Sequence, residues 1–178
     1  MALSAVAAVL LLASPPVHAE DLPVEPVAEA AHPMSGTWRI ATSADKLRTT
    51  LDAAIEDVAA EFNILIRELV RHKLSGATKV CDTYVLDVKA DTVDFSCNGN
   101  PPVALKRDGS PFQTQNDAGE PVRGTVAVQG ERVVVTWMGE AGGRINTFSM
   151  KGGTLRLDAK VTSSHMPKPL KWTVDYAR

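Results

Sequence analysis

The chain has 178 residues, of which 44% are hydrophobic, and it carries 19 basic and 21 acidic side chains. This length allows a single domain with a sizeable core. Four of the acidic residues precede Gly36, so the rest of the chain is close to neutral and has no basic run. That charge balance argues against a nucleic acid as a partner.

The N-terminus has the pattern of a secretory signal. Residues 5–13 form an apolar run, and Val17-His18-Ala19 follows two prolines. About nine apolar residues are too few to cross a bilayer, which needs roughly 20. A short apolar run before a small-x-small site is typical of a cleaved signal peptide, so we expect a signal at residues 1–19 and a periplasmic or secreted protein. No second apolar segment follows, so the sequence predicts no membrane span.

Residues 20–35 mix prolines, acids and alanines without periodicity. Such a composition cannot build a packed element and predicts a flexible leader. We expect the remaining residues, 36–178, to form one domain.

One segment has a strong helical pattern. Between Ser43, a suitable N-cap, and Gly76, a suitable left-handed stop, apolar residues recur at steps of three or four. This spacing places them in one stripe on a helix: Leu47, Leu51, Ile55, Val58, Phe62, Leu65 and Leu69. Two arrangements remain open. The lack of Gly or Pro inside the segment favours one long helix, whereas the widening of the stripe after Asn63 allows a bend into two helices.

The rest of the domain has the pattern of strands separated by turns. A first strand is expected at 36–41, before the helical segment, and nine more follow at 79–88, 92–97, 103–106, 111–115, 122–129, 132–138, 144–150, 154–162 and 170–176. Asp-Gly, Gly-Gly and Gly-Glu junctions favour hairpins, and alternating apolar and polar residues indicate one buried face.

The predicted fold is therefore mainly β. It is an antiparallel up-and-down barrel of about ten strands, with one long helix or a helix pair inserted after the first strand. An open sheet wrapped around the helix is the alternative.

Two cysteines, Cys81 and Cys97, are present. In an exported chain they predict a disulfide that closes a small loop and contributes roughly 3 kcal/mol. The strand pattern, however, turns Cys97 inward and Cys81 outward. Pairing then requires a β-bulge or a twisted strand end between them.

The two ends of the domain resemble the calycin barrels, the group of lipocalins and fatty-acid-binding proteins. These proteins carry a Gly-x-Trp in the first strand and an Arg in the last strand that packs across the Trp. The matching positions here are Gly36, Trp38 and Arg178, and the resemblance implies that they close one end of the barrel. A helical insert after the first strand is similar to the lid of the fatty-acid-binding branch, and the layout is similar to that of some exported bacterial proteins.

The resemblance has limits. The helical insert is longer than the paired lid of the fatty-acid-binding proteins. Their Arg-x-Tyr carboxylate clamp near the C-terminus is also missing, because Tyr176-Ala177-Arg178 has the reverse order.

No catalytic residue, metal site or cofactor is expected. Glu68 and His72 stand at i and i+4 on the helix, but no second His or Cys cluster supports a metal site. The sequence also has no nucleophile elbow, phosphate loop or zinc-protease motif.

The apolar stripe has two interpretations: it completes the core, or it caps a cavity and controls access of an apolar ligand. The second interpretation makes the protein a monomeric, non-enzymatic binder of a hydrophobic or lipid-like small molecule. Its expected ligand contacts come from the helix and from aromatic strand residues: Phe62, Leu65, Leu69, Tyr84, Trp137 and Trp172. The alternative is an envelope structural or protein-interaction module with a solid core.

Overall fold

A computed structural model describes residues 31–115 and 119–178. The predicted signal peptide and residues 20–30 of the predicted leader lie outside this part. The ten strands of the described residues form one antiparallel sheet in the order β4-β3-β2-β1-β10-β9-β8-β7-β6-β5. Their bounds are β1 Gly36–Ile40, β2 Thr83–Val88, β3 Thr92–Cys97, β4 Val103–Lys106, β5 Phe112–Gln115, β6 Pro121–Gln129, β7 Arg132–Met138, β8 Gly142–Lys151, β9 Thr154–Ser163 and β10 Leu170–Ala177.

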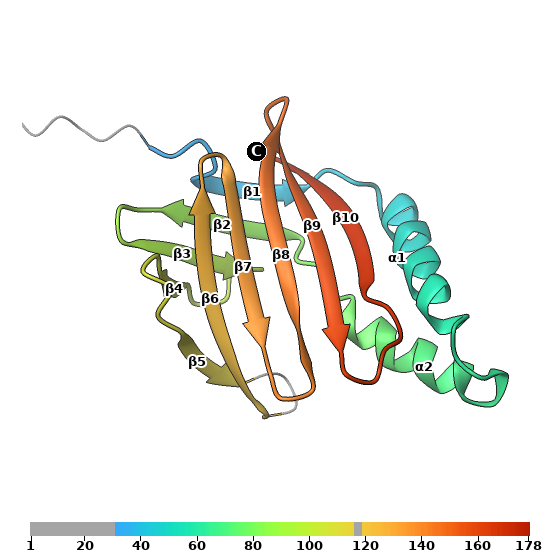
Figure 1. Ribbon diagram of the computed structural model, residues 1–178. Helices are drawn as coiled ribbons and strands as arrows, with labels where there is room; N and C mark the ends of the chain where they lie inside the picture. The colour runs from blue at the N-terminus through green and yellow to red at the C-terminus, as the bar shows by residue number, and fades with distance from the viewer. Residues whose placement is uncertain (1–30, 116–118) are drawn as a thin grey trace, which may run out of the picture. The chain divides into compact units, whose positions relative to one another are not determined.

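The sheet is a nearly closed barrel, which confirms the predicted fold class. Strands β1 to β4 run across strands β6 to β10, so the two parts of the sheet face each other (Figure 1). Strand β1 joins these parts because it pairs with β2 on one side and with β10 on the other. The strand order leaves β4 and β5 as the two edges of the sheet.

Two helices, α1 (Ala44–Ala59) and α2 (Ile64–Ala77), lie between β1 and β2. The sequence leaves open one long helix or two helices, and the structure has two. Asn63 explains the break without Gly or Pro, because its Oδ1 accepts a hydrogen bond of 3.0 Å from the Leu65 amide and caps α2. The prediction that the helical segment ends at Gly76 is wrong, because Gly76 lies inside α2.

Helix α1 packs beside β10 and buries Ile55 and Val58. The loop between β9 and β10 holds the C-terminal end of this helix. There, Lys168 Nζ lies 2.8 Å from an Asp57 carboxylate oxygen and 3.1 Å from one of Glu61. These ion pairs are partly exposed and contribute little stability. The apolar contact with β10 therefore holds α1 in place.

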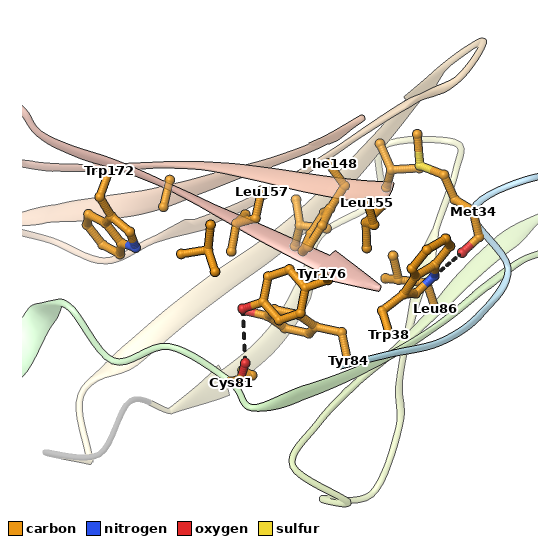
Figure 2. Close-up of a cluster of buried hydrophobic side chains, with 14 of the residues drawn as sticks. Met34, Trp38, Cys81, Tyr84, Leu86, Phe148, Leu155, Leu157, Trp172 and Tyr176 are labelled. Carbon is orange, nitrogen blue, oxygen red and sulfur yellow. Dashed lines mark hydrogen bonds between the residues drawn. The ribbon is translucent and has the colours of Figure 1, made fainter. Parts of the chain in front are cut away.

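An aromatic cluster fills the middle of the barrel. The Tyr84 ring centroid lies 5.2 Å from that of Phe95, 5.3 Å from that of Phe148 and 5.2 Å from that of Tyr176. These rings come from β2, β3, β8 and β10, so the cluster joins the two facing parts of the sheet. Figure 2 shows three of them, Tyr84, Phe148 and Tyr176. Burial raises the pKa of both tyrosines, which keeps the phenols neutral. The Tyr176 hydroxyl donates a hydrogen bond of 2.9 Å to the Cys81 carbonyl.

Trp38, Arg178 and Gly36 lie together at one end of the barrel, here called the closed end. Trp38 is fully buried, and its Nε1 donates to the Met34 carbonyl at 2.8 Å. The Arg178 guanidinium carbon is 4.7 Å from the Trp38 ring centroid, and Arg178 Nη2 donates to the Pro33 carbonyl at 2.8 Å. A Cβ on Gly36 would lie 3.6 Å from Arg178 Nε. The packed chain thus begins before β1, because Met34 is itself fully buried.

The predicted disulfide between Cys81 and Cys97 is confirmed. The sequence predicts that this strand begins at residue 79, but β2 begins at Thr83, so no bulge is needed. Cys81 therefore precedes the strand and does not follow its alternation of faces. The bond ties the irregular segment at 78–82 to β3.

The disulfide should stabilise the fold measurably. Closing a loop of this length contributes about 3 kcal/mol by restricting the unfolded chain. We expect the double substitution Cys81→Ala/Cys97→Ala to lower the free energy of unfolding by about that amount in urea denaturation. A reductant should destabilise the unmodified protein similarly and leave the double variant unchanged. A loss below about 1 kcal/mol would show that the bond does not stabilise the barrel.

Candidate functional site

An open cleft of about 1320 Å³ lies at the end of the barrel opposite Trp38 and Arg178. It is bordered by the C-terminal end of α2, the edge strands β4 and β5, and the turn between β7 and β8. Its apolar and small lining residues are Gly76, Ala77, Val103, Pro121, Val122, Trp137, Gly139, Ala141, Gly142, Gly143 and Val161. The polar ones are Lys73, Thr114, Gln115, Glu120, Glu140, Arg144, Ser164 and His165.

Trp137 forms a side wall of this cleft. It stands opposite Gly124 in the pairing of β7 with β6. A Cβ on Gly124 would lie only 2.3 Å from the Trp137 ring, so the indole lies directly on the β6 backbone. This contact needs glycine and holds the ring against the wall, where it leaves the cleft open.

Arg144 lies at the inner end of the cleft. Its Nε donates to Asn146 Oδ1 and its Nη1 to the Lys79 carbonyl, both at 2.8 Å. The guanidinium carbon lies 5.1 Å from the ring centroid of Trp172, a cation–π distance. Nη2 is buried without a hydrogen-bond partner among the described residues. Burial lowers the pKa of Arg144, but a guanidinium remains charged at neutral pH.

The three predicted strand residues have different surroundings. Trp137 lines the cleft, and Trp172 is buried beside the guanidinium of Arg144. Tyr84 is 1% exposed and lies in the aromatic cluster. Of the three predicted strand residues, Trp137 therefore lines the cleft, whereas Trp172 and Tyr84 belong to the buried core.

The three predicted helical residues are not among those that line the cleft. Phe62 is partly buried and packs against the core. Leu65 and Leu69 are 88% and 58% exposed, beside the exposed Ile64 and Ile66. The break before α2 explains this, because the stripe of α1 does not continue in register through a second helix. These four aliphatic residues form an exposed apolar patch on α2.

Sequence reasoning missed Arg144. Residues 144, 146 and 148 of β8 share one face, since side chains alternate along a strand. Phe148 on that face is fully buried and Asn146 is nearly so. The sequence could therefore have indicated Arg144, because it and Asn146 are polar residues at inward positions of a barrel strand.

The described residues provide no other obvious chemistry. Among them, no group of three or more His, Cys, Asp or Glu could hold a metal ion. Glu68, one half of the i, i+4 pair with His72, accepts a hydrogen bond from Arg71. None of the described helices is both long and apolar enough to cross a membrane.

Comparison with solved structures identifies the fold as a calycin barrel of the fatty-acid-binding kind. A structure described as the REP1-NXSQ fatty acid transporter has a TM-score of 0.50 and 16% identity, covering 81% of this chain and 94% of that one. Apo lipid binding protein 8 of Caenorhabditis elegans has a TM-score of 0.51 and 13% identity, covering 82% and 95%. At such identities the likeness shows the fold alone. The sequence matches no protein-family model, and no curated protein is similar to it.

Gly→Ala substitutions at Gly124 and at Gly76 should change the free energy of unfolding in opposite directions, because the Trp137 ring covers Gly124 and nothing lies near Gly76. Gly124→Ala should lower the free energy of unfolding by about 1–3 kcal/mol, because the new methyl group displaces the indole. Gly76→Ala should raise it by about 0.5–1 kcal/mol, since that site is helical and has open space around the Cβ. Urea denaturation followed by tryptophan fluorescence measures both. Equal stability of the Gly124→Ala variant and the unmodified protein would contradict the described packing.

Proposed function

We propose that the protein binds a hydrophobic or amphiphilic small molecule in the cleft and is not an enzyme. The observation that carries this proposal is the unequal filling of the barrel. Aromatic side chains fill the closed end and the middle, whereas the other end opens into the cleft beyond Arg144. Its volume of about 1320 Å³ is ample for a ligand, because typical pockets have roughly 300–1,000 Å³.

The wall of the cleft suits an apolar chain. Trp137 and Val161 stand on β7 and β9, on either side of Arg144, in the register of the sheet. Val103 and Val122 add apolar surface from β4 and β6. The two similar solved structures, described as a fatty acid transporter and a lipid binding protein, support the same class of ligand.

The proposal includes export to the periplasm or the medium, removal of residues 1–19 as a signal, and a monomeric barrel at 36–178. The sequence of residues 1–19 supports export. The disulfide between Cys81 and Cys97 is compatible with it, because such bonds persist in oxidising compartments.

A second candidate function is a protein-interaction module of the cell envelope. The apolar patch on α2 favours it, since exposed patches of large aliphatic residues often mark contact surfaces. An interaction module should bind a partner protein through α2 and hold no ligand in the cleft. A small-molecule binder should hold a ligand in the cleft and need no partner at α2.

Blocking the cleft should abolish ligand binding. Val161→Trp places a large ring in the cleft and should weaken binding of Nile red, an uncharged apolar fluorescent probe, by about tenfold or more. Val85→Trp is the matched control. Val85 is exposed on β2, away from the cleft, and its substitution should leave the affinity unchanged.

Fluorescence titration measures these affinities, and thermal unfolding checks that both variants fold. Mass spectrometry of a solvent extract of the purified protein should also detect an apolar compound. Failure of the unmodified protein to bind the probe, together with an empty extract, would contradict the proposed function.

A further inference from the structure

The disulfide between Cys81 and Cys97 lies between two borders of the cleft. On one side, Gly76 and Ala77 at the end of α2 line the cleft, and Cys81 follows them in the connection from α2 to β2. On the other side, Cys97 ends β3, and Val103 of the next strand, β4, lines the cleft. The Cα atoms of the two cysteines lie 5.6 Å apart. The bond therefore joins two chain segments that reach the cleft from different elements.

Helix α2 depends on this connection for its position on the barrel. The helix packs mainly on α1, where Arg71 Nε donates a hydrogen bond of 2.7 Å to a Glu56 carboxylate oxygen. Leu74 of α2 is buried, whereas Leu65 is 88% exposed. Because α1 is the helix that packs beside β10, the C-terminal end of α2 is held at the cleft chiefly by the segment at 78–82.

Without the disulfide, hydrogen bonds would be the main constraint on this segment. The Cys81 carbonyl accepts from the Tyr176 hydroxyl at 2.9 Å (Figure 2). The Lys79 carbonyl accepts from Arg144 Nη1, at the inner end of the cleft, at 2.8 Å. Such bonds add little net stability, because water can replace either partner when the segment moves. Reduction should therefore loosen the connection and leave the strand pairing, which begins at Thr83, intact.

We propose that the disulfide between Cys81 and Cys97 is a redox switch for the cleft: the oxidised protein binds its ligand tightly, and reduction by a dithiol lowers the affinity. The inference rests on the proposed function and adds the regulation of the same site. In the oxidised protein, the border of the cleft is ordered before the ligand arrives. In the reduced protein, binding must order the end of α2 and the connection, and the entropy lost in doing so reduces the affinity.

Reduction proceeds by exchange with the dithiol. Cys97 is partly exposed and Cys81 is 8% exposed, so a thiolate of the dithiol attacks Cys97 Sγ. The bond between the cysteines breaks, and Cys81 leaves as a thiolate that takes up a proton. The second thiol of the dithiol then attacks the dithiol sulfur bound to Cys97, which leaves and also takes up a proton. Two electrons and two protons pass to the cysteines, and the dithiol becomes a cyclic disulfide.

The first test compares the affinities of the oxidised and the reduced protein for Nile red, with dithiothreitol as the dithiol. We expect the dissociation constant to rise about fivefold or more on reduction. The double variant Cys81→Ala/Cys97→Ala should bind as weakly as the reduced protein, with or without dithiothreitol. This variant controls for an effect of the reductant on the probe. Circular dichroism and thermal unfolding show whether each form is folded at the temperature of the titration.

Thermodynamic linkage provides a second test that needs no variant. A ligand that binds the oxidised form more tightly must stabilise the disulfide by the same factor. Saturating Nile red should therefore raise the ratio of reduced to oxidised dithiothreitol needed for half-reduction by about fivefold or more. Alkylation of the free thiols followed by mass spectrometry measures the reduced fraction.

Hydrogen exchange locates the change in the chain. On reduction, the amides of residues 76–82 should exchange faster, whereas those of β7, β8 and β9 should keep their protection. A purely structural role of the disulfide would instead raise exchange throughout the sheet.

The outcomes separate the switch from the proposed function. Equal affinity of the folded oxidised and reduced forms would overturn the switch and leave the proposed function intact. Unfolding of the whole protein on reduction, or faster exchange throughout the sheet, would also overturn the switch, because the bond would then support the fold and not the border of the cleft. Failure of the oxidised protein to bind Nile red would overturn the proposed function itself.

Discussion

The pairing of the first strand with the last is the constraint on which the rest of the structure depends. It places Ala177 beside Arg39 and thereby brings Arg178 over the ring of Trp38. The same pairing joins the two facing parts of the sheet, so that β2 and β10 contribute neighbouring rings to one aromatic cluster. Without it, the chain would form an open meander with two further exposed edges, a form prone to aggregation.

The strand order leaves β4 and β5 as unpaired edges, and residues of both strands line the cleft. The interior consequently changes along the barrel from fully apolar, through the aromatic cluster, to the charged Arg144 and then to the cleft. At this boundary the guanidinium is held by hydrogen bonds to Asn146 and the Lys79 carbonyl and by the ring of Trp172. The disulfide contributes to this arrangement, since it ties down the 78–82 segment whose Lys79 carbonyl orients the guanidinium.

Most of the fold was predictable from the sequence because each strand carries a local signal. Alternation and turn residues located all ten strands, and β3, β4 and β7 agree in both bounds. The helix break was not predictable with certainty, since it depends on a cap by Asn63 and not on Gly or Pro. The exposure of Leu65 follows from that break. The alternation along β8 could have placed Arg144 inside the barrel, but its contacts with Trp172 of β10 and with the Lys79 carbonyl of the α2–β2 connection are long-range and have no local pattern.

The most direct test of the ligand-binding account is a crystal structure with 16-bromohexadecanoic acid, in which anomalous scattering locates the bromine at the end of the tail. If the cleft binds the ligand, one bromine lies within the cleft, against its apolar wall. A bromine over the exposed Ile64 and Leu65 of α2, with no electron density in the cleft, would contradict it. That result would make the helix surface, and not the barrel interior, the functional part of the protein.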